Sequence, residues 1–192
     1  MAPAEDQIQD DPRDDKRDRA LLQRIAQDRD VQAMEALYIR FRPRLVPFLT
    51  RITRDEGLIE EAFNDVMSKV WDNAAQYKGQ SKVSSWIFSI AYRICLRMVK
   101  KQQRRESFVS FVGDALPDVA SSEGDPGIQP DRELAQAVKR LSAKHRMVIE
   151  LCYFEGYALE GIAEIIDCPV NTVKTRLHHA RKKLEQYLSE AS

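Results

Sequence analysis

Residues that turn or cross-link a chain are scarce in this sequence. Its 192 residues include 7 glycines, 3 cysteines and 3 histidines. The glycine share is about half of the roughly 7% found in average proteins, which argues against a fold with many tight turns. Few reversals and a charged fraction of 31% favour helices. Cys95, Cys152 and Cys168 form no C-x-x-C pair, so neither a disulfide framework nor a cysteine-based zinc site is indicated.

The motifs of common enzyme classes are also missing. The chain has no P-loop, no G-x-S-x-G and no H-E-x-x-H, and its histidines form no ligand pattern with carboxylates. We therefore expect no catalytic residue, no metal site and no cofactor.

Signals for export or membrane insertion are absent as well. No apolar run approaches the about 18 residues of a membrane span. The N-terminus is acidic and polar, with Glu5, Asp6, Asp10 and Asp11, unlike a signal peptide. A cytoplasmic protein without membrane insertion is expected.

The net charge is zero, with 30 basic and 30 acidic residues. Neutrality argues at first against a nucleic-acid partner, because nucleic-acid-binding domains are usually basic. The charges are nevertheless segregated. Residues 93–105 hold six bases and no acid, residues 169–183 hold five bases and no acid, and residues 106–131 hold six acids and no base. Blocks of this kind often mark interaction partners.

The hydrophobic periodicity predicts an all-α fold with two small helical domains joined by a flexible acidic linker. Residues 1–18 are expected to form a flexible tail, 19–105 the first domain, 106–131 the linker and 132–192 the second domain. Pro43 and Pro47 predict a kink or a restart in the first helical stretch. Further helices are expected at about 55–74, 85–104, 132–141, 143–154, 159–166 and 170–188, with Ser84 as the cap of the helix at 85–104.

The second domain has the spacing of a helix-turn-helix. A short helix ends at Ile166, residues 167–169 turn, and a longer helix begins that would enter the major groove of DNA. One face of this helix is apolar. The opposite face carries Asn171, Lys174, Thr175, His178, His179 and Lys182. Such side chains can contact base edges and phosphates, although an ordinary solvated face is the alternative.

A stripe of basic residues runs along the helix predicted at 85–104, the third of the first domain. Arg93, Arg97, Lys100, Lys101 and Arg104 fall within an arc of about 100° on a helix. A polyanion lying along the stripe would relieve the repulsion among these cations, whereas the alternative is again a solvated face. Trp86 projects to the same side, where it would either stack on an unpaired base or pack in the core.

The predicted helix at 55–74 has an acidic edge. Glu60, Glu61, Asn64, Asp65 and Ser68 lie off its apolar stripe. This edge is either a solvated face or a dock for a basic or polar partner helix.

Taken in order, these motifs resemble those of a bacterial extracytoplasmic-function sigma factor of the sigma-70 superfamily. Residues 60–71 are similar to the acidic helix that binds core RNA polymerase. Residues 84–91 and the basic run after them resemble the segment that melts the promoter. Residues 161–166 and 171–181 resemble the C-terminal helix-turn-helix.

The resemblance implies that the chain binds RNA polymerase core, through the clamp helices of the largest subunit and the flap, and directs it to promoter DNA. It also implies control by an anti-sigma factor. The implied core-binding residues are Glu60, Glu61, Asn64 and Asp65. The implied residues for recognition and melting of the −10 element are Tyr77, Lys78, Lys82, Trp86, Arg93, Arg97, Lys100, Lys101 and Arg104. The implied −35 residues are Asn171, Thr172, Lys174, Thr175, Arg176, His178, His179, Arg181 and Lys182.

Some residues depart from the family pattern. Arg93 stands where Asn is frequent, Ala158 replaces a Ser or Thr cap, and Asp167 stands where Gly usually turns the chain, which Asp tolerates because it visits the left-handed region. Two alternatives stay open: a conventional helix-turn-helix regulator, and a sigma-like decoy that binds an anti-sigma protein without DNA. The regulator leaves the motifs at 55–104 unexplained, and a decoy has no need of the basic stripe.

Overall fold

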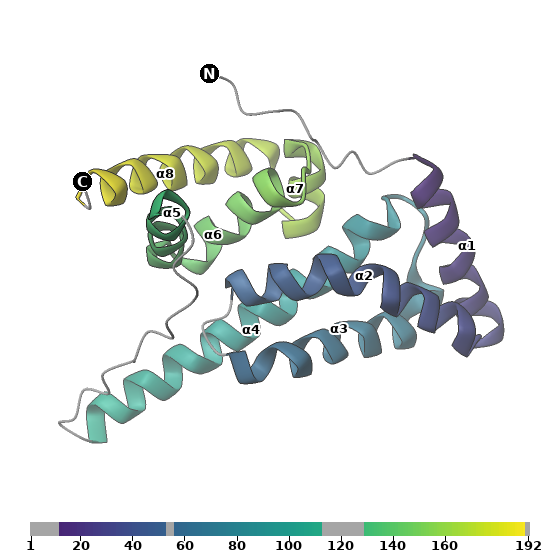
Figure 1. Cartoon of the computed structure of the whole chain (residues 1–192). Helices are drawn as coiled ribbons and strands as arrows, with labels where there is room; N and C mark the ends of the chain where they lie inside the picture. Colours follow the sequence, from purple (N-terminus) through teal and green to yellow (C-terminus); the bar gives the residue numbers. More distant parts are fainter. Residues whose placement is uncertain (1–11, 53–55, 113–128, 191–192) are drawn as a thin grey trace.

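The computed structural model describes the backbone of residues 12–52, 56–112 and 129–190, and the side chains of 14–52, 57–98, 100–101 and 133–190. Every regular element in these ranges is helical, as the periodicity predicted (Figure 1). None of the helices so described is long and apolar enough to cross a membrane. Most of the expected tail and linker, residues 1–11 and 113–128, lies outside the described residues.

Four helices form the first half of the molecule: α1 (Pro12–Asp28), α2 (Val31–Ile52), α3 (Ile59–Asn73) and α4 (Val83–Val112). Single 3₁₀ turns at Glu56–Leu58 and Ala74–Gln76 flank α3. The apolar faces of the helices meet around Phe41, Phe48, Phe63 and Phe88, none of which exposes more than 1% of its surface. Burial of such side chains supplies most of the stability of helices, which are marginal on their own.

Two details of this half, the starts of α1 and α4, differ from the sequence predictions, and a third excludes one of the two alternatives predicted at Pro43 and Pro47. Helix α1 begins at Pro12, so residues 12–18 are helical although they were expected in the tail. A proline in the first turn, followed by Asp14 and Asp15, favours a helix start there. Helix α2 continues through Pro43 and Pro47 without a restart. Helix α4 begins at Val83, which places Ser84 inside its first turn and not at the cap.

The second half contains α5 (Gln129–Arg140), α6 (Ala143–Ile149), a π-helical turn (Glu150–Phe154), α7 (Leu159–Ile166) and α8 (Val170–Ser189). Helices α7 and α8 form the predicted helix-turn-helix. Asp167 makes the turn with φ 51° and ψ 61°, which confirms the left-handed conformation expected of it. Ala158 precedes α7 and provides no side-chain cap. The side chains of Val173, Leu177 and Ala180 bury the inner face of α8.

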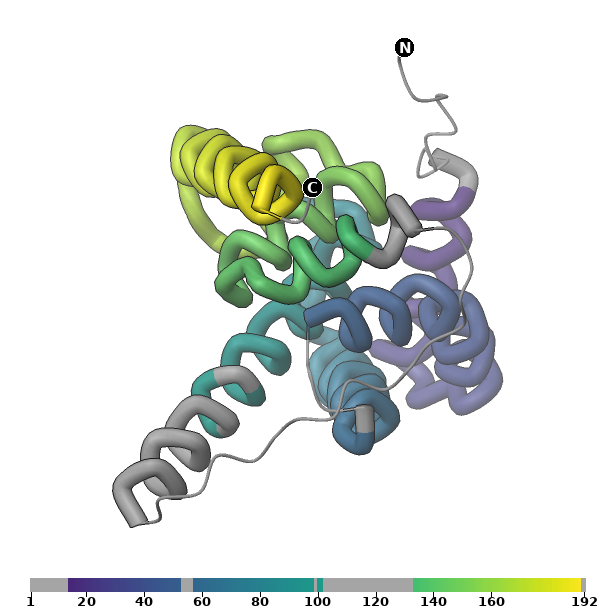
Figure 2. Tube along the Cα trace, turned by 60° about the vertical axis from the view of Figure 1, so that its left-hand side comes forward, coloured from purple at the N-terminus to yellow at the C-terminus, as the bar shows by residue number. Residues whose placement is uncertain are grey.

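The two halves are in direct contact, as Figures 1 and 2 show for α6 and α7 lying against α2 and α4. The ring of Phe88 meets that of Tyr157 edge to face, with centroids 5.6 Å apart. Around this apolar contact, Arg44 pairs with Glu155 at 3.1 Å. The buried guanidinium of Arg146 donates to the carbonyl of Ile52 at 3.0 Å. The interface therefore combines an aromatic contact with charged groups that find partners across it.

Candidate nucleic-acid interface

The basic stripe of α4 lies on the surface. The side chains of Arg93, Arg97, Lys100 and Lys101 are exposed, whereas that of Arg104 lies outside the described residues. Within the described part of the chain, no carboxylate forms an ion pair with these four cations. They present positive charge to solvent along one helix face, which suits a polyanionic strand.

Trp86 lies about two helical turns before Arg93, the first residue of the stripe, and its side chain is in contact with both the core and the surface. Its half-buried ring packs against the core and lies 5.5 Å from the ring of Tyr77. It also lines a surface pocket of about 560 Å³ together with Arg93, Arg97 and Lys100. The other side of the pocket is lined by Lys69 and Asn73 of α3 and by Gln76 of the 3₁₀ turn after it. The fold thus places an aromatic ring and several cations around one hollow, as base stacking with phosphate contacts requires.

The loop before α4, residues 77–82, carries three further candidates. Lys78 and Lys82 are exposed, and Tyr77 is half-buried with its hydroxyl donating to the carbonyl of Ser81. Burial raises the pKa of Tyr77 above its ordinary value, so this hydroxyl stays a donor at neutral pH. Gly79 adopts φ +71°, a left-handed conformation that glycine allows without strain.

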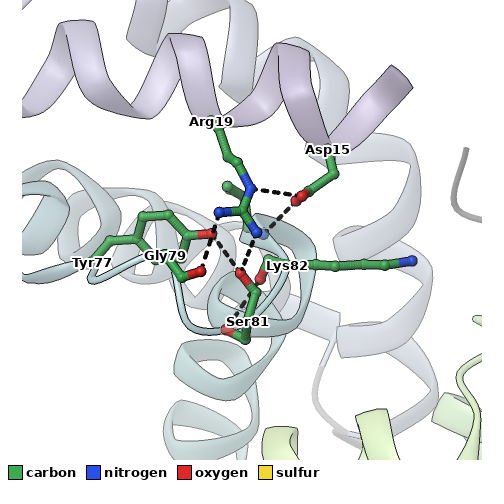
Figure 3. Close-up of polar contacts among 7 residues, drawn as sticks. Asp15, Arg19, Tyr77, Gly79, Ser81 and Lys82 are labelled. Carbon is green, nitrogen blue, oxygen red and sulfur yellow. Dashed lines mark hydrogen bonds and ion pairs between the residues drawn. The ribbon is translucent and has the colours of Figure 1, made fainter. Parts of the chain in front are cut away.

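Two residues that hold this loop were missed by the sequence analysis. From about sixty residues away, Arg19 of α1 donates to two carbonyls of the loop (Figure 3). Asp15 of α1 accepts from the backbone N–H of Val83, the residue that directly follows the loop. Residue Asp15 falls within the stretch that was predicted to be a flexible tail. Their spacing of four residues on one helix is a local signal for the ion pair that they form, but no local pattern indicates their bonds to main-chain atoms of a distant segment.

The acidic edge of α3 divides into two groups of residues. Glu60 forms a two-point ion pair with Arg42 of α2, at 2.6 and 3.0 Å, and Asn64 accepts a hydrogen bond from Tyr38. The hydrogen bond from Arg42 lowers the pKa of Glu60. Glu61, Asp65 and Ser68 lie toward α4 instead, where they line a pocket of about 540 Å³ that Arg97 and Lys101 also line.

On α8, most of the predicted −35 residues are exposed. These are Asn171, Lys174, Thr175, His178, His179, Arg181 and Lys182, whereas Thr172 and Arg176 are partly buried. The hydroxyl of Thr175 donates to the carbonyl of Asn171, which leaves its lone pairs able to accept. Arg181 donates to the hydroxyl of Tyr153, a residue of the π-helical turn that the sequence analysis did not select.

His145 of α6 lies beside this surface and was also not selected. Its ring centroid is 6.4 Å from that of His179. Burial lowers the pKa of His145, and the positive charge of Lys183 lowers it further. A neutral imidazole therefore lies behind the basic face of α8 at neutral pH. No group of three His, Cys, Asp or Glu side chains in the described ranges is placed to hold a metal ion.

Comparison with known families matches both halves of the chain. Residues 37–105 match the family model "Sigma-70 region 2", and residues 131–184 match "Sigma-70, region 4". The ECF RNA polymerase sigma factor SigK of Mycolicibacterium vanbaalenii is 30% identical over 176 residues, which cover 90% of this chain and 89% of that protein. The chain belongs to the extracytoplasmic-function sigma factors of the sigma-70 family.

A further relative and two solved structures with the same fold extend over most of this sigma factor. The ECF RNA polymerase sigma factor RpoE of Cereibacter sphaeroides is 30% identical, with 91% of this chain and 99% of that protein covered. The solved structure of CnrH in complex with the cytosolic domain of CnrY has the same fold, with a TM-score of 0.68, 18% identity and coverage of 92% and 99%. The sigma factor RpoE of Bartonella quintana, solved with the anti-sigma factor NepR, has a TM-score of 0.66 and 23% identity. The match covers 81% of this chain and 96% of that one.

Family membership confirms the class expected from the motifs and the all-helical fold with two sigma domains. It also confirms that the protein is not an enzyme. A sigma factor acts in transcription initiation through the surfaces it presents, and its region 4 is a DNA-binding helix-turn-helix. The exposed groups on α3, α4 and α8 are therefore considered as binding groups.

Proposed function

We propose that this sigma factor binds core RNA polymerase in the cytoplasm and directs it to specific promoters, where α4 opens the −10 element and α8 reads the −35 element. Region 2, from α2 to α4, would dock on the clamp helices of the largest subunit. Region 4, which contains α5 to α8, would contact the flap. The exposed faces named above are the parts of the chain available for these partners.

The opening of the −10 element is proposed for the pocket between α3 and α4. Unstacking duplex DNA costs a few kcal/mol per step, so the melted strand needs compensating contacts. Trp86 offers a ring for stacking, and Arg93, Arg97 and Lys100 offer charge for the backbone of the same strand. Binding of phosphates by these exposed cations would release counterions and make opening sensitive to salt.

Recognition of the −35 element is proposed for the N-terminal half of α8. Asn171 and Thr175 are exposed near the start of the helix, the part that contacts base edges in other helix-turn-helix proteins. Lys174, Lys182 and Arg181 extend the positive charge toward the phosphates on either side.

Control by an anti-sigma factor completes the proposal. Among the solved structures with this fold, RpoE is in complex with the anti-sigma factor NepR, and CnrH is in complex with the cytosolic domain of CnrY. We expect an anti-sigma protein to compete with polymerase and DNA for surfaces on both regions of this chain.

The observation that supports this function best is the pair of exposed cationic faces, one on α4 and one on α8, in a chain that matches both sigma regions. Run-off transcription from genomic DNA of the source organism, with core polymerase alone or with the protein added, tests it. New start sites that depend on the protein are expected. If none appear, binding assays distinguish the two alternative functions. A conventional helix-turn-helix regulator would bind DNA without polymerase, whereas a sigma-like decoy would not bind DNA.

A further inference from the structure

The loop of residues 77–82 is held from one side by helix α1. The guanidinium of Arg19 donates from Nη1 to the carbonyl of Gly79 at 3.1 Å and from Nη2 to the carbonyl of Ser81 at 3.0 Å. A planar guanidinium that bonds two carbonyls of one short loop restrains both at a defined spacing and angle. The main chain of the loop is thus bonded to a side chain that comes from outside it (Figure 3).

Asp15 joins this arrangement to the start of α4. Its Oδ2 accepts from Nε of Arg19 at 2.7 Å, and its Oδ1 accepts from the backbone N–H of Val83 at 2.9 Å. Val83 is the first residue of α4, so the carboxylate caps this helix from a different helix. A single side chain therefore orients Arg19 and ends the loop at a defined point.

The conformation of the loop at Gly79 and Ser81 allows the close approach of Arg19. Gly79 has φ +71°, and a Cβ on it would lie 3.2 Å from Nη1 of Arg19. The carbonyl of Ser81 receives a second hydrogen bond, from the hydroxyl of Tyr77, whose ring lies 5.8 Å from the guanidinium carbon. The carbonyls of Gly79 and Ser81 face Arg19 of α1 in this arrangement, whereas the side chain of Lys82 extends away from the ion pair (Figure 3).

We propose that Asp15 and Arg19 are positioning residues for promoter selection: they fix the loop of residues 77–82, and thereby set which −10 bases it accepts. The inference rests on the function proposed above, in which this loop meets the melted −10 strand. A loop held in one conformation presents Lys78 and Lys82 in one geometry, whereas a loose loop would adapt to several sequences.

A simple role in attaching α1 to the bundle is the competing explanation, and the chain contains a control for it. Arg40 of α2 pairs with Asp14 at 2.8 Å and with Asp18 at 2.6 Å, so it also binds α1 to the bundle. None of its contacts named here involves the loop. Arg40→Ala should therefore weaken the attachment of α1 without releasing the loop carbonyls, whereas Arg19→Ala should release them.

The first measurement is hydrogen exchange on the free full-length protein. We expect the amides of residues 78–83 to exchange about fivefold faster or more in Arg19→Ala and in Asp15→Ala than in the unmodified chain. In Arg40→Ala, the same amides should exchange within about twofold of the unmodified rate. Unchanged loop exchange in Arg19→Ala, or equal acceleration by Arg40→Ala, would overturn the positioning role.

The second measurement is promoter selection. Core polymerase with each variant transcribes a pool of linear duplexes that carry a random segment upstream of a common reporter, and the transcribed templates are sequenced. Arg19→Ala should lower the preference for the favoured base in the −10 segment by about fivefold, with −35 preferences unchanged. Arg19→Lys should retain part of that preference, because an ammonium can bond one of the carbonyls but lacks the planar fork.

The controls separate failure of this inference from failure of the proposed function. If the unmodified protein yields no transcripts from the pool, the proposed function fails. If it selects promoters and Arg19→Ala selects the same −10 bases with the same strength, the function stands and the positioning role is wrong. Loss of −10 preference in Arg40→Ala to the same extent would assign the effect to α1 attachment and contradict the proposal as well.

Discussion

Nη1 of Arg51 lies 3.2 Å from Oε2 of Glu150, which joins the last turn of region 2 helix α2 to the π-helical turn of region 4. Glu150 is fully buried, and its other oxygen, Oε1, has no hydrogen-bond partner among the described residues. Burial raises the pKa of Glu150 to about 7, and the pairing with Arg51 offsets only part of that effect. The neighbouring charges are those of Glu155, which raises the pKa, and Arg146, which lowers it.

The first prediction is a pH-dependent stability at this contact. Because the pKa of Glu150 is raised from 4.5 to about 7, the folded protein keeps a proton that the unfolded chain releases. The contribution of Glu150 to stability is therefore complete below about pH 4.5 and is lost as pH rises to about 7, with a total change on the order of 3 kcal/mol.

Thermal unfolding of the unmodified protein and of Glu150→Gln, followed from pH 5 to pH 8, measures this contribution. The two should be similar in stability at pH 5, and the variant should be more stable at pH 8, by about 1–3 kcal/mol. His145, whose pKa is lowered by burial, acts in the opposite direction but is present in both proteins and cancels in their difference. A difference in stability that does not vary with pH would contradict the prediction.

The second prediction concerns the basic stripe. Changing Arg97 and Lys100 to Ala should weaken promoter opening by about tenfold at moderate salt and reduce the slope of its salt dependence by about 2, since two phosphate contacts are lost. Permanganate footprinting of the melted strand across a salt series gives both values. A matched pair of exposed cations on α1, Lys16 and Arg17, provides the control when changed to Ala. Opening unchanged by the stripe variant would leave the stripe as a solvated face.

The third prediction uses the division of the acidic edge. Glu60 is already paired with Arg42, whereas Glu61 and Asp65 lie beside the pocket facing α4. Changing Glu61 and Asp65 together to Ala should weaken binding to core polymerase by about tenfold. Glu60→Ala with Asn64→Ala should have a smaller effect, because those side chains must first leave partners within the chain. Affinity is measured by competition for core polymerase. Equal losses in the two double variants would contradict the prediction, because the pairing of Glu60 and Asn64 with α2 would then have no effect on binding to polymerase.

The fourth prediction separates base contacts from phosphate contacts on α8. Asn171→Ala should relax the preference at one −35 position, at a cost of about 1–3 kcal/mol on the favoured sequence. Lys182→Ala should weaken all promoters alike and lower the salt slope by about 1. Binding of the polymerase complex to a set of −35 variants distinguishes the two patterns, with Glu185→Ala on the same helix as control. The prediction for Asn171 is wrong if its variant weakens every promoter equally.

Much of the fold follows from local sequence patterns. The apolar residues of α3, α7 and α8 recur at helical spacing, so the existence and register of these helices were predictable. The turn at Asp167 was predictable because Asp is one of the few residues besides glycine that adopt the left-handed conformation. The basic stripe was predictable from spacing alone, since cations four and seven residues apart on a helix share a face whatever surrounds them.

Contacts between distant segments were beyond such patterns. The cap of α4 is a clear case: the sequence suggested Ser84, whereas Val83 is capped by Asp15 of another helix. The start of α1 was placed too late: Pro12 and the acids after it are a local signal for a helix start, but the polar residues 12–18 gave no sign that Asp14 and Asp18 pair with Arg40 of α2. The pairing of Glu60 with Arg42 likewise depends on how α2 lies against α3.

The sequence by itself determined the class of this protein, its helices and the two cationic faces, because helical periodicity and charge spacing act within a few turns of one element. The tertiary structure alone decided that α1 holds the loop at residues 77–82, that the acidic edge divides into two groups, and that Arg51 meets a buried Glu150 across the two halves. Those relationships join residues 18 to 99 positions apart. Their geometry is set by the packing of apolar helix faces, which no local pattern of charges encodes.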